Sequence, residues 1–205
     1  MKETGIIMSG NHPKLILDGI KTMTRRVIKP QPFEVSQQSQ LIRLREGDPY
    51  LRTAEYYCPY GQVGDRLWVR ENFFYGGGFY DNRTCNIRYA VDNVEIKYKI
   101  PDGYSWDKTC KWCYTKLDGS HPIRPSIFMP RWASRITLEI TEVRVERLQE
   151  ISDSDCQAEG CQYPQWHGSH TSWKGAYKAL WDSLNAKRGY GWEVNPWLWV
   201  ISFKL

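Results

Sequence analysis

The sequence predicts an α+β fold in a single domain over residues 1–205, and three observations carry that prediction. Apolar residues alternate with polar ones over residues 136–140, which is the period of a half-buried strand. Residues 197–203 are apolar almost throughout, as in a strand that is buried on both faces. Residues 173–184 repeat apolar side chains at three- and four-residue spacing, which predicts a helix with one buried face. No linker rich in Gly, Ser or Pro divides the chain, so we expect one domain.

The first elements are a strand near residues 5–9 and a short helix over residues 13–18. Pro13 fixes a φ angle suited to a first helical turn, and Gly19 can adopt the left-handed conformation that ends a helix. An extended segment follows and ends near Pro30.

On a regular strand, Lys21 and Thr24 would point to opposite faces. A site that uses both side chains therefore requires a bend or a bulge between them.

Two insertions are expected, around residues 33–57 and 100–125. Residues 33–57 show weak periodicity, so we expect irregular or edge structure there. Residues 86–91 alternate in polarity and predict a strand of a hairpin, and a long loop follows it.

Residues 67–71 predict a strand that places Glu71 at the end of an apolar stripe, with Trp68 and Arg70 on the other face. Such a carboxylate either faces solvent at the strand end or is desolvated in a pocket. The sequence leaves both readings open.

The C-terminal third contains one strand irregularity and two capped helices. The apolar set slips by one residue after residue 140, which predicts a β-bulge near Thr141 or Glu142. Ser152 begins a capping box, so a short helix should run toward Glu159 and stop at Gly160. Ser172 is the expected cap of the longer helix.

The composition of the chain limits the kinds of molecule that it is expected to bind. The formal net charge is +5 and aromatic residues make up 14% of the chain, with 10 Trp and 13 Tyr. A mildly basic, ring-rich chain suits a nucleoside or a short single-stranded RNA, and we expect no long duplex DNA as a partner. No apolar run approaches the roughly 20 residues that span a bilayer, and no signal-peptide core is present, so we expect a cytoplasmic protein without a membrane partner.

The six cysteines are expected to be reduced thiols. Cys110 and Cys113 have zinc-knuckle spacing, and the pairs Cys156/Cys161 or His167/His170 could complete four ligands. The spacing of these pairs is irregular, so we expect no metal and no cofactor.

Lys21, Thr24 and Glu71 are the side chains from which a catalytic site could be assembled. A threonine hydroxyl needs a base, and a lysine serves when burial lowers its pKa. Glu71 could orient the lysine or manage protons, although an ion pair with Lys21 would oppose the use of that lysine as a base.

The pattern Gly-x-Lys-x-x-Thr-x-Arg, formed by Gly19, Lys21, Thr24 and Arg26, resembles the signature of the ASCH domain family within the PUA-like superfamily. Many members have Glu where this chain has Thr24. Residues 58–71, 129–135 and 195–197 also resemble the long ASCH-like proteins of bacteriophages and prophages. The resemblance implies a PUA-like mixed β-barrel with flanking helices and long insertions.

A subgroup of ASCH-like proteins are amidohydrolases that convert N4-acetylcytidine to cytidine with a lysine, a threonine and a glutamate. Lys21 and Thr24 match that subgroup, and Glu71 is carried over from strand order. The resemblance therefore implies Lys21, Thr24 and Glu71 as catalytic residues. The expected substrate-binding residues are Arg26, Trp68, Arg70, Arg131 and Trp132.

Arg135 is expected near the phosphates or exocyclic oxygens of the same substrate. Core packing is the alternative for both tryptophans. Two other functions remain open, a non-catalytic module that binds RNA or a modified base, and a metal-independent ribonuclease.

Overall fold

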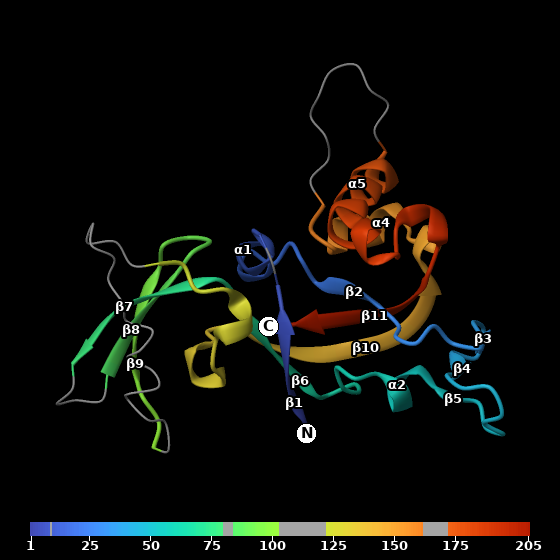
Figure 1. Cartoon of the computed structure of the whole chain (residues 1–205), viewed down its shortest axis with the longest axis horizontal. Coiled ribbons are helices and arrows are strands. Elements are labelled where there is room, and N and C mark those ends of the chain that lie inside the picture. The colour runs from blue at the N-terminus through green and yellow to red at the C-terminus, as the bar shows by residue number, and fades with distance from the viewer. Residues whose placement is uncertain (9, 80–83, 103–121, 162–171) are drawn as a thin grey trace. The chain divides into compact units, whose positions relative to one another are not determined.

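The computed structural model describes residues 1–8, 10–79, 84–102, 122–161 and 172–205 (Figure 1). It contains helices and strands in mixed order, which confirms the α+β class. The chain forms two compact units. The first unit comprises residues 1–3, 15–66 and 138–205, and the second comprises residues 4–14 and 67–137.

The sheet of the first unit is built around β11 (Trp197–Lys204). This strand pairs antiparallel with β10 (Thr137–Arg147) on one side and with β2 (Met23–Val27) on the other (Figure 1). Its interior residues are buried, as expected for an apolar strand covered on both faces. The register between β10 and β11 shifts between Ile140 and Glu142, which confirms the predicted bulge.

Two helices, α4 (Asp153–Ala158) and α5 (Trp173–Asn185), lie beside each other in this unit (Figure 1). The predicted caps are present, because Ser152 Oγ accepts the Asp155 amide at 3.1 Å and Ser172 Oγ accepts the Gly175 amide at 3.1 Å. The buried face of α5 packs into a cluster that contains Leu148, Ile151, Cys156, Tyr177, Trp181 and Leu198. The predicted stripe thus supplies Tyr177 and Trp181 to the core, whereas Leu184 at its end is 44% exposed.

Helix α1 (His12–Leu17) ends as predicted, with Gly19 at a φ of 71°. The next residues do not yet belong to a strand. The amide of Lys21 donates to Leu15 O at 3.0 Å and the amide of Thr22 donates to Ala158 O at 2.9 Å. The bend that a site with Lys21 and Thr24 requires thus lies immediately before β2.

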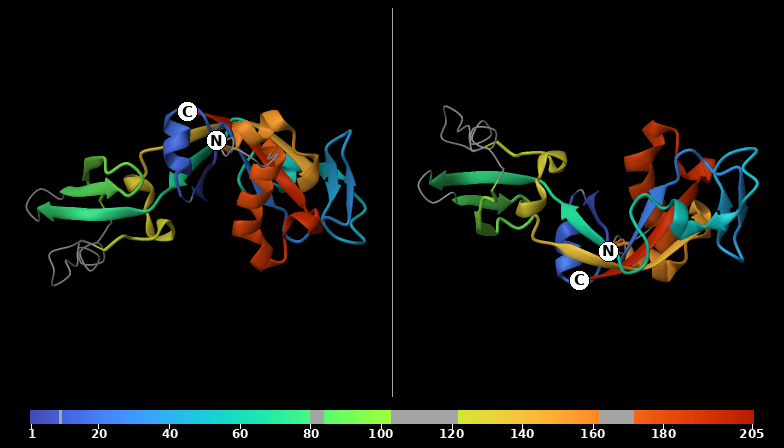
Figure 2. Two further views of the ribbon diagram at one scale, coloured as in Figure 1. Left: turned by 90° about the horizontal axis from the view of Figure 1, so that it is seen from above. Right: turned by 90° about the horizontal axis from the view of Figure 1, so that it is seen from below.

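The insertion at 33–57 is more regular than expected. It forms an antiparallel sheet of β3 (Glu34–Ser36), β4 (Leu41–Arg43) and β5 (Arg52–Thr53), which Figure 2 shows in blue to cyan from two sides. The four-residue helix α2 (Ala54–Tyr57) follows β5 directly. Strands of two or three residues are too short to show a period, which explains why the sequence did not predict them.

The second unit contains most of β1 (Glu3–Ile7) and β6 (Arg66–Arg70), which are neighbours in strand order. It also contains an antiparallel meander of β7 (Phe73–Phe79), β8 (Thr84–Tyr89) and β9 (Glu95–Lys99). Strand β8 alternates between half-buried and buried residues, as predicted. Its buried residues join Phe73, Tyr75, Ile100, Met129 and Ala133 in the core of this unit.

Short 3-10 turns are found in both units. In the second unit these are η2 (Ser126–Phe128) and η3 (Arg131–Ala133). In the first unit, η4 (Leu148–Glu150) precedes α4, and η5 (Ala186–Arg188) continues from α5 and is followed by η6 (Trp192–Val194).

The strands of the described residues form open sheets, and no closed barrel is found among them. Strand β11 pairs with β10 and with β2, and the PUA-like barrel that the resemblance implies stays a prediction. Within the described ranges, no helix has both the length and the apolar character needed to cross a membrane.

Candidate functional site

Lys21 is the most unusual side chain of the first unit, because it is a charged residue that is only 1% exposed. Its Nζ donates to Met23 O at 2.7 Å, to Glu159 O at 2.8 Å and to Glu159 Oε2 at 2.6 Å. An ammonium group has three donors, so these three bonds use all of its protons. The lysine is therefore fixed in position by β2 and by the end of α4.

Glu159 is the carboxylate partner of Lys21, and the sequence did not predict it. It caps the C-terminus of α4, where its amide donates to Asp155 O at 2.8 Å. Gly160 then turns the chain with a φ of 83°, the stop that the sequence did predict. The available signal was a glutamate directly before a helix-ending glycine, but sequence alone gives no measure of its burial.

Burial of Lys21 and the charge of Glu159 shift the pKa of Lys21 in opposite directions. Desolvation by burial lowers its pKa, and the charge and hydrogen bond of Glu159 raise it only in part. The charge of Arg26 lowers it further. The pKa of Lys21 therefore lies below the usual 10.5, which favours the neutral amine relative to a free lysine.

Thr24 lies on β2 opposite Ile201 and is 4% exposed. The carbonyl that Lys21 contacts belongs to the peptide group that joins Met23 to Thr24. Among the described residues, the Thr24 hydroxyl has no hydrogen-bond partner. The structure thus brings Lys21 and Thr24 into one buried region, with Glu159 as the acid.

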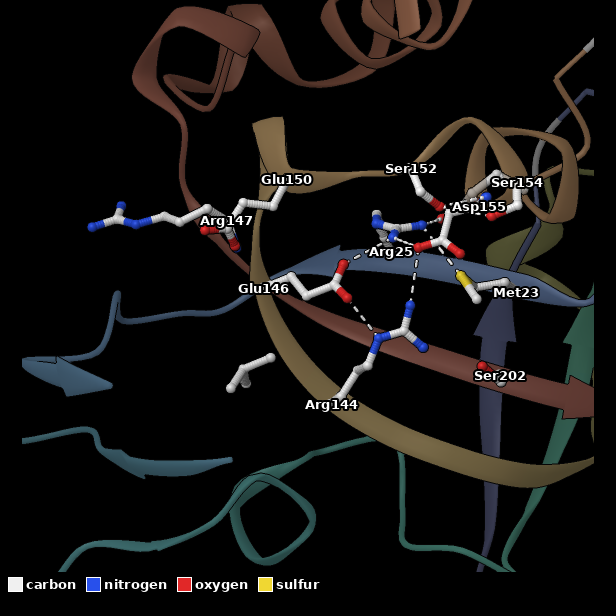
Figure 3. Close-up of polar contacts among 12 residues, drawn as sticks. Met23, Arg25, Arg144, Glu146, Arg147, Glu150, Ser152, Ser154, Asp155 and Ser202 are labelled. Atoms are coloured by element: carbon white, nitrogen blue, oxygen red, sulfur yellow. Dashed lines mark hydrogen bonds and ion pairs between the residues drawn. The ribbon is translucent and has the colours of Figure 1, made fainter. Parts of the chain in front are cut away.

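Beside this pair, Arg25 and Arg144 share the carboxylates of Glu146 and Asp155 (Figure 3). Arg25 Nη2 lies 2.9 Å from Glu146 Oε2 and 2.5 Å from Asp155 Oδ2. Its Nη1 lies 3.6 Å from Glu159 Oε1, an oxygen that has no hydrogen-bond partner in the described part of the chain. This network ties β2, β10 and α4 together around the Lys21 pair.

The pKa of Arg25 reflects the same arrangement. Burial lowers it, but Glu159, Tyr177, Asp155 and Glu146 together raise it above its usual value. Arg25 therefore remains charged at all working pH values.

Arg26, the last residue of the signature, is half-buried on β2 opposite Trp199. Its charge acts on two neighbours, since it lowers the pKa of Lys21 and opposes the rise that burial causes in the pKa of Tyr60. Arg26 is thus close enough to Lys21 for its charge to act there, and its part in substrate binding stays a prediction.

Glu71 belongs to the second unit and is 1% exposed, so the solvent-facing reading of this carboxylate is wrong. Its two oxygens accept hydrogen bonds from Arg135 Nε at 2.9 Å and Nη2 at 2.8 Å. Arg135 Nη1 also contacts Asp92 at 2.8 Å. Burial raises the pKa of Glu71, and Arg135 opposes that rise only in part. A catalytic role for Glu71 stays a prediction.

The other predicted substrate-binding residues also belong to the second unit. Trp68 is 9% exposed, and the guanidinium of Arg70 lies 4.4 Å from its ring centroid. Gly5 approaches the same ring so closely that a Cβ there would lie 2.7 Å from Trp68. Backbone and arginine thus already contact the indole, as core packing predicts.

Arg131 and Trp132 lie on η3. Arg131 Nη2 donates to Thr137 Oγ1 at 3.3 Å. The Trp132 ring packs edge-on against Tyr98 with centroids 6.0 Å apart, beside the core of the second unit. Their part in substrate binding stays a prediction.

Cys110, Cys113, His167 and His170 lie outside the described residues. In the described ranges, no three or more His, Cys, Asp or Glu side chains are grouped to hold a metal ion. Cys58, Cys85, Cys156 and Cys161 are free thiols.

Gly160 should resist substitution more strongly than Gly189. Both have a positive φ, 83° and 81°, and alanine in that conformation costs roughly 1–2 kcal/mol. A Cβ at Gly160 would also lie 2.9 Å from Leu15 Cδ1 and 3.4 Å from Lys21 Cβ, whereas nothing lies within 4 Å at Gly189. We expect Gly160→Ala to lower the free energy of unfolding by about 1–3 kcal/mol more than Gly189→Ala. Equal losses in urea unfolding would contradict this packing.

Alkaline pH should destabilise the first unit partly through Cys156. Burial raises the pKa of this thiol from 9.0 to about 12, so the unfolded chain ionises first as the pH rises. The stability associated with the neutral thiol is complete below pH 9 and is lost as the pH approaches 12. Relative to Cys156→Ala, the wild type should lose up to about 1.4 kcal/mol per pH unit in this window. Parallel stability curves from denaturant unfolding would exclude this contribution.

Comparisons with known proteins gave one structural likeness. No family model matches the chain, and no curated protein matches it either. Among solved structures, the chain is similar to the crystal structure of an ASCH domain from Lactobacillus crispatus JV V101, with 13% identity and a TM-score of 0.41. The likeness covers 98% of this chain and 78% of that chain.

Proposed function

We propose that the protein binds RNA or a modified nucleoside and hydrolyses the N4-acyl group of a cytidine, with Thr24 as the nucleophile and Lys21 as the base. One observation carries the proposal. A buried lysine with a lowered pKa is fixed against the peptide that precedes a threonine whose hydroxyl has no hydrogen-bond partner among the described residues. The ASCH-type signature of residues 19–26 supports the substrate class.

In the first half of the reaction, Thr24 Oγ attacks the acyl carbon while its proton moves to the neutral Nζ of Lys21. The neutral amine keeps two donors and gains a lone pair, so it gives up one of its three observed bonds to do so. The C–N bond then breaks, and Lys21 returns the proton to N4 of the leaving cytosine. The products of this half are cytidine and an acyl ester on Thr24.

In the second half, water attacks the ester carbon and Lys21 accepts one proton of that water. The C–O bond to Thr24 breaks, Lys21 passes its proton to Thr24 Oγ, and the acyl group leaves as a carboxylic acid that releases the second proton of the water to solvent. The chain returns to its starting state, so one amide and one water are consumed in each cycle.

We assign the carboxylate role to Glu159 because it contacts Lys21 Nζ at 2.6 Å and is itself buried. Its charge stabilises the ammonium that forms when Lys21 accepts a proton. Both oxygens of Glu71, in contrast, already accept hydrogen bonds from Arg135.

The test is to incubate the wild type, Thr24→Ala and Thr22→Ala with N4-acetylcytidine and to follow cytidine by chromatography. Thr22 is exposed and lies two residues away, so Thr22→Ala is a matched control. We expect cytidine from the wild type and from Thr22→Ala, and none from Thr24→Ala. Turnover that survives in Thr24→Ala would overturn the nucleophile assignment.

An RNA oligonucleotide incubated in parallel separates the other functions. Bound, intact RNA with unchanged N4-acetylcytidine would replace the hydrolase by a non-catalytic binding module. Cleaved RNA without released acetate would replace it by a ribonuclease.

A further inference from the structure

The insertion at 33–57 forms a pocket that has no part in the Lys21 site. Its volume is about 290 Å³, and it is lined by Leu44, Arg45, Asp48, Arg52, Tyr56 and Tyr57. Strand β5 supplies Arg52. Helix α2 follows β5 directly and supplies Tyr56 and Tyr57. The three short strands of this insertion lie side by side in both views of Figure 2.

At this pocket, the guanidinium of Arg52 lies against the rings of Tyr56 and Tyr50. The guanidinium of Arg52 lies 4.6 Å from the ring centroid of Tyr56 and 5.5 Å from that of Tyr50. Neither side chain is buried in the core, since Tyr56 is 57% exposed and Tyr50 is 63% exposed. A guanidinium covers one face of a ring, and exposure of this size leaves further ring surface open to a flat ligand.

A fixed acceptor lies next to the rings. Asp48 Oδ1 accepts the amide of Tyr50 at 3.1 Å, and Asp48 Oδ2 accepts the hydroxyl of Tyr57 at 3.1 Å. Each carboxylate oxygen can accept a second hydrogen bond. Asp48 is therefore oriented and still able to accept a hydrogen bond from an amino group.

A cation completes the pocket. Arg45 is exposed, and the described residues provide no ion-pair partner for its guanidinium. Arginine binds phosphate oxygens through two parallel N–H groups. The pocket thus offers an aromatic face, an acceptor and a phosphate-binding group within one small volume.

We propose that this pocket binds one unpaired nucleotide of a single-stranded RNA. The base stacks on Tyr56, Asp48 accepts a hydrogen bond from an exocyclic amine of the base, and Arg45 contacts a neighbouring phosphate. An acidic peptide would meet the carboxylate of Asp48, and an apolar helix would have to bury two arginines and an aspartate. A nucleotide satisfies all three kinds of group.

The test measures RNA binding in a Thr24→Ala background, so that the RNA is not altered. A short unstructured RNA with a fluorescent label is titrated with this protein and with versions that also carry Tyr56→Ala or Tyr56→Phe. We expect Tyr56→Ala to weaken binding by about 5- to 150-fold, because stacking on one base is worth roughly 1–3 kcal/mol. Tyr56→Phe keeps the ring and should bind like its parent.

The Arg45 contact has its own readout. Because one phosphate contact to a single strand contributes about 0.7 to the slope of log affinity against log salt, Arg45→Gln should make that slope shallower by about 0.7. An unchanged slope would exclude the phosphate contact. Thermal unfolding of each variant verifies that the fold is retained.

The outcomes are distinct from those of the proposed hydrolysis. Equal RNA affinity of Tyr56→Ala and its parent, or equal losses in Tyr56→Ala and Tyr56→Phe, would overturn the stacking site. Absence of RNA binding by the parent would also overturn it, and would point to a protein as the occupant. Hydrolysis of free N4-acetylcytidine should be the same in Tyr56→Ala and the wild type, and its absence in both would overturn only the Lys21 chemistry.

Discussion

Replacing Glu159 with glutamine should lower the free energy of unfolding by about 3–5 kcal/mol at neutral pH. The substitution leaves Lys21 buried with no carboxylate at 2.6 Å, and it removes the negative charge that faces Arg25. Loss of one partner of a buried pair is costly because the remaining charge has neither solvent nor counterion. Urea unfolding of the two proteins measures the difference.

The chain supplies a matched control for this experiment. Lys178 and Glu193 also form a pair at 2.6 Å, but their side chains are 44% and 80% exposed, against 0% and 7% for Lys21 and Glu159. Glu193→Gln should therefore cost about 0–1 kcal/mol. Similar losses in the two variants would show that burial does not determine the contribution of the Lys21 pair.

A double substitution tests the cause. Lys21→Met combined with Glu159→Met removes both charges and keeps most of the side-chain volume, so it should be more stable than Glu159→Gln alone. If the double variant is the less stable protein, lost hydrogen bonds rather than an unpaired charge account for the effect.

The second large effect concerns turnover. Lys21→Met should reduce N4-acetylcytidine hydrolysis by about 10²–10⁴-fold, which is the usual contribution of a positioned base. Lys187→Met, at an exposed lysine of η5, is the control and should keep full activity. Both variants are assayed at a temperature at which circular dichroism shows them folded.

The assignment of Lys21 as the base also predicts how the rate of hydrolysis changes with pH. A base must be neutral, so the rate should rise with pH through the pKa of Lys21. Burial lowers that pKa, and the midpoint should lie below 10.5. A rate that falls with increasing pH would contradict the assignment of Lys21 as the base, whatever the effect of Lys21→Met.

Local features of the fold were predictable because they depend on neighbouring residues. The caps at Ser152 and Ser172, the helix stop at Gly160 and the bulge after Ile140 all follow from spacing within a few residues. The meander β3–β5 was not predictable, since its strands have two or three residues. The barrel that the resemblance implies stays a prediction, because closure depends on strand pairing far apart in the chain.

The candidate site divides in the same way. Lys21 and Thr24 could be selected from the sequence because they lie in one short motif. In the structure both are buried in the first unit. Glu159 could not be paired with Lys21 because 138 residues separate them. Burial of Glu71 was one of two readings that the sequence left open, and its arginine partner lies 64 residues away.

Because β11 is the C-terminal strand and pairs with β2, the sheet of the first unit cannot form until the end of the chain has been synthesised. Thr24 faces Ile201, so the strand that carries the threonine emerges long before its sheet neighbour exists. At about 5–20 residues per second, the wait between positions 24 and 201 lasts about 10–35 seconds on the ribosome. A nascent chain released or cleaved before residue 197 would leave β2 without its sheet partner and would be exposed to aggregation and proteolysis.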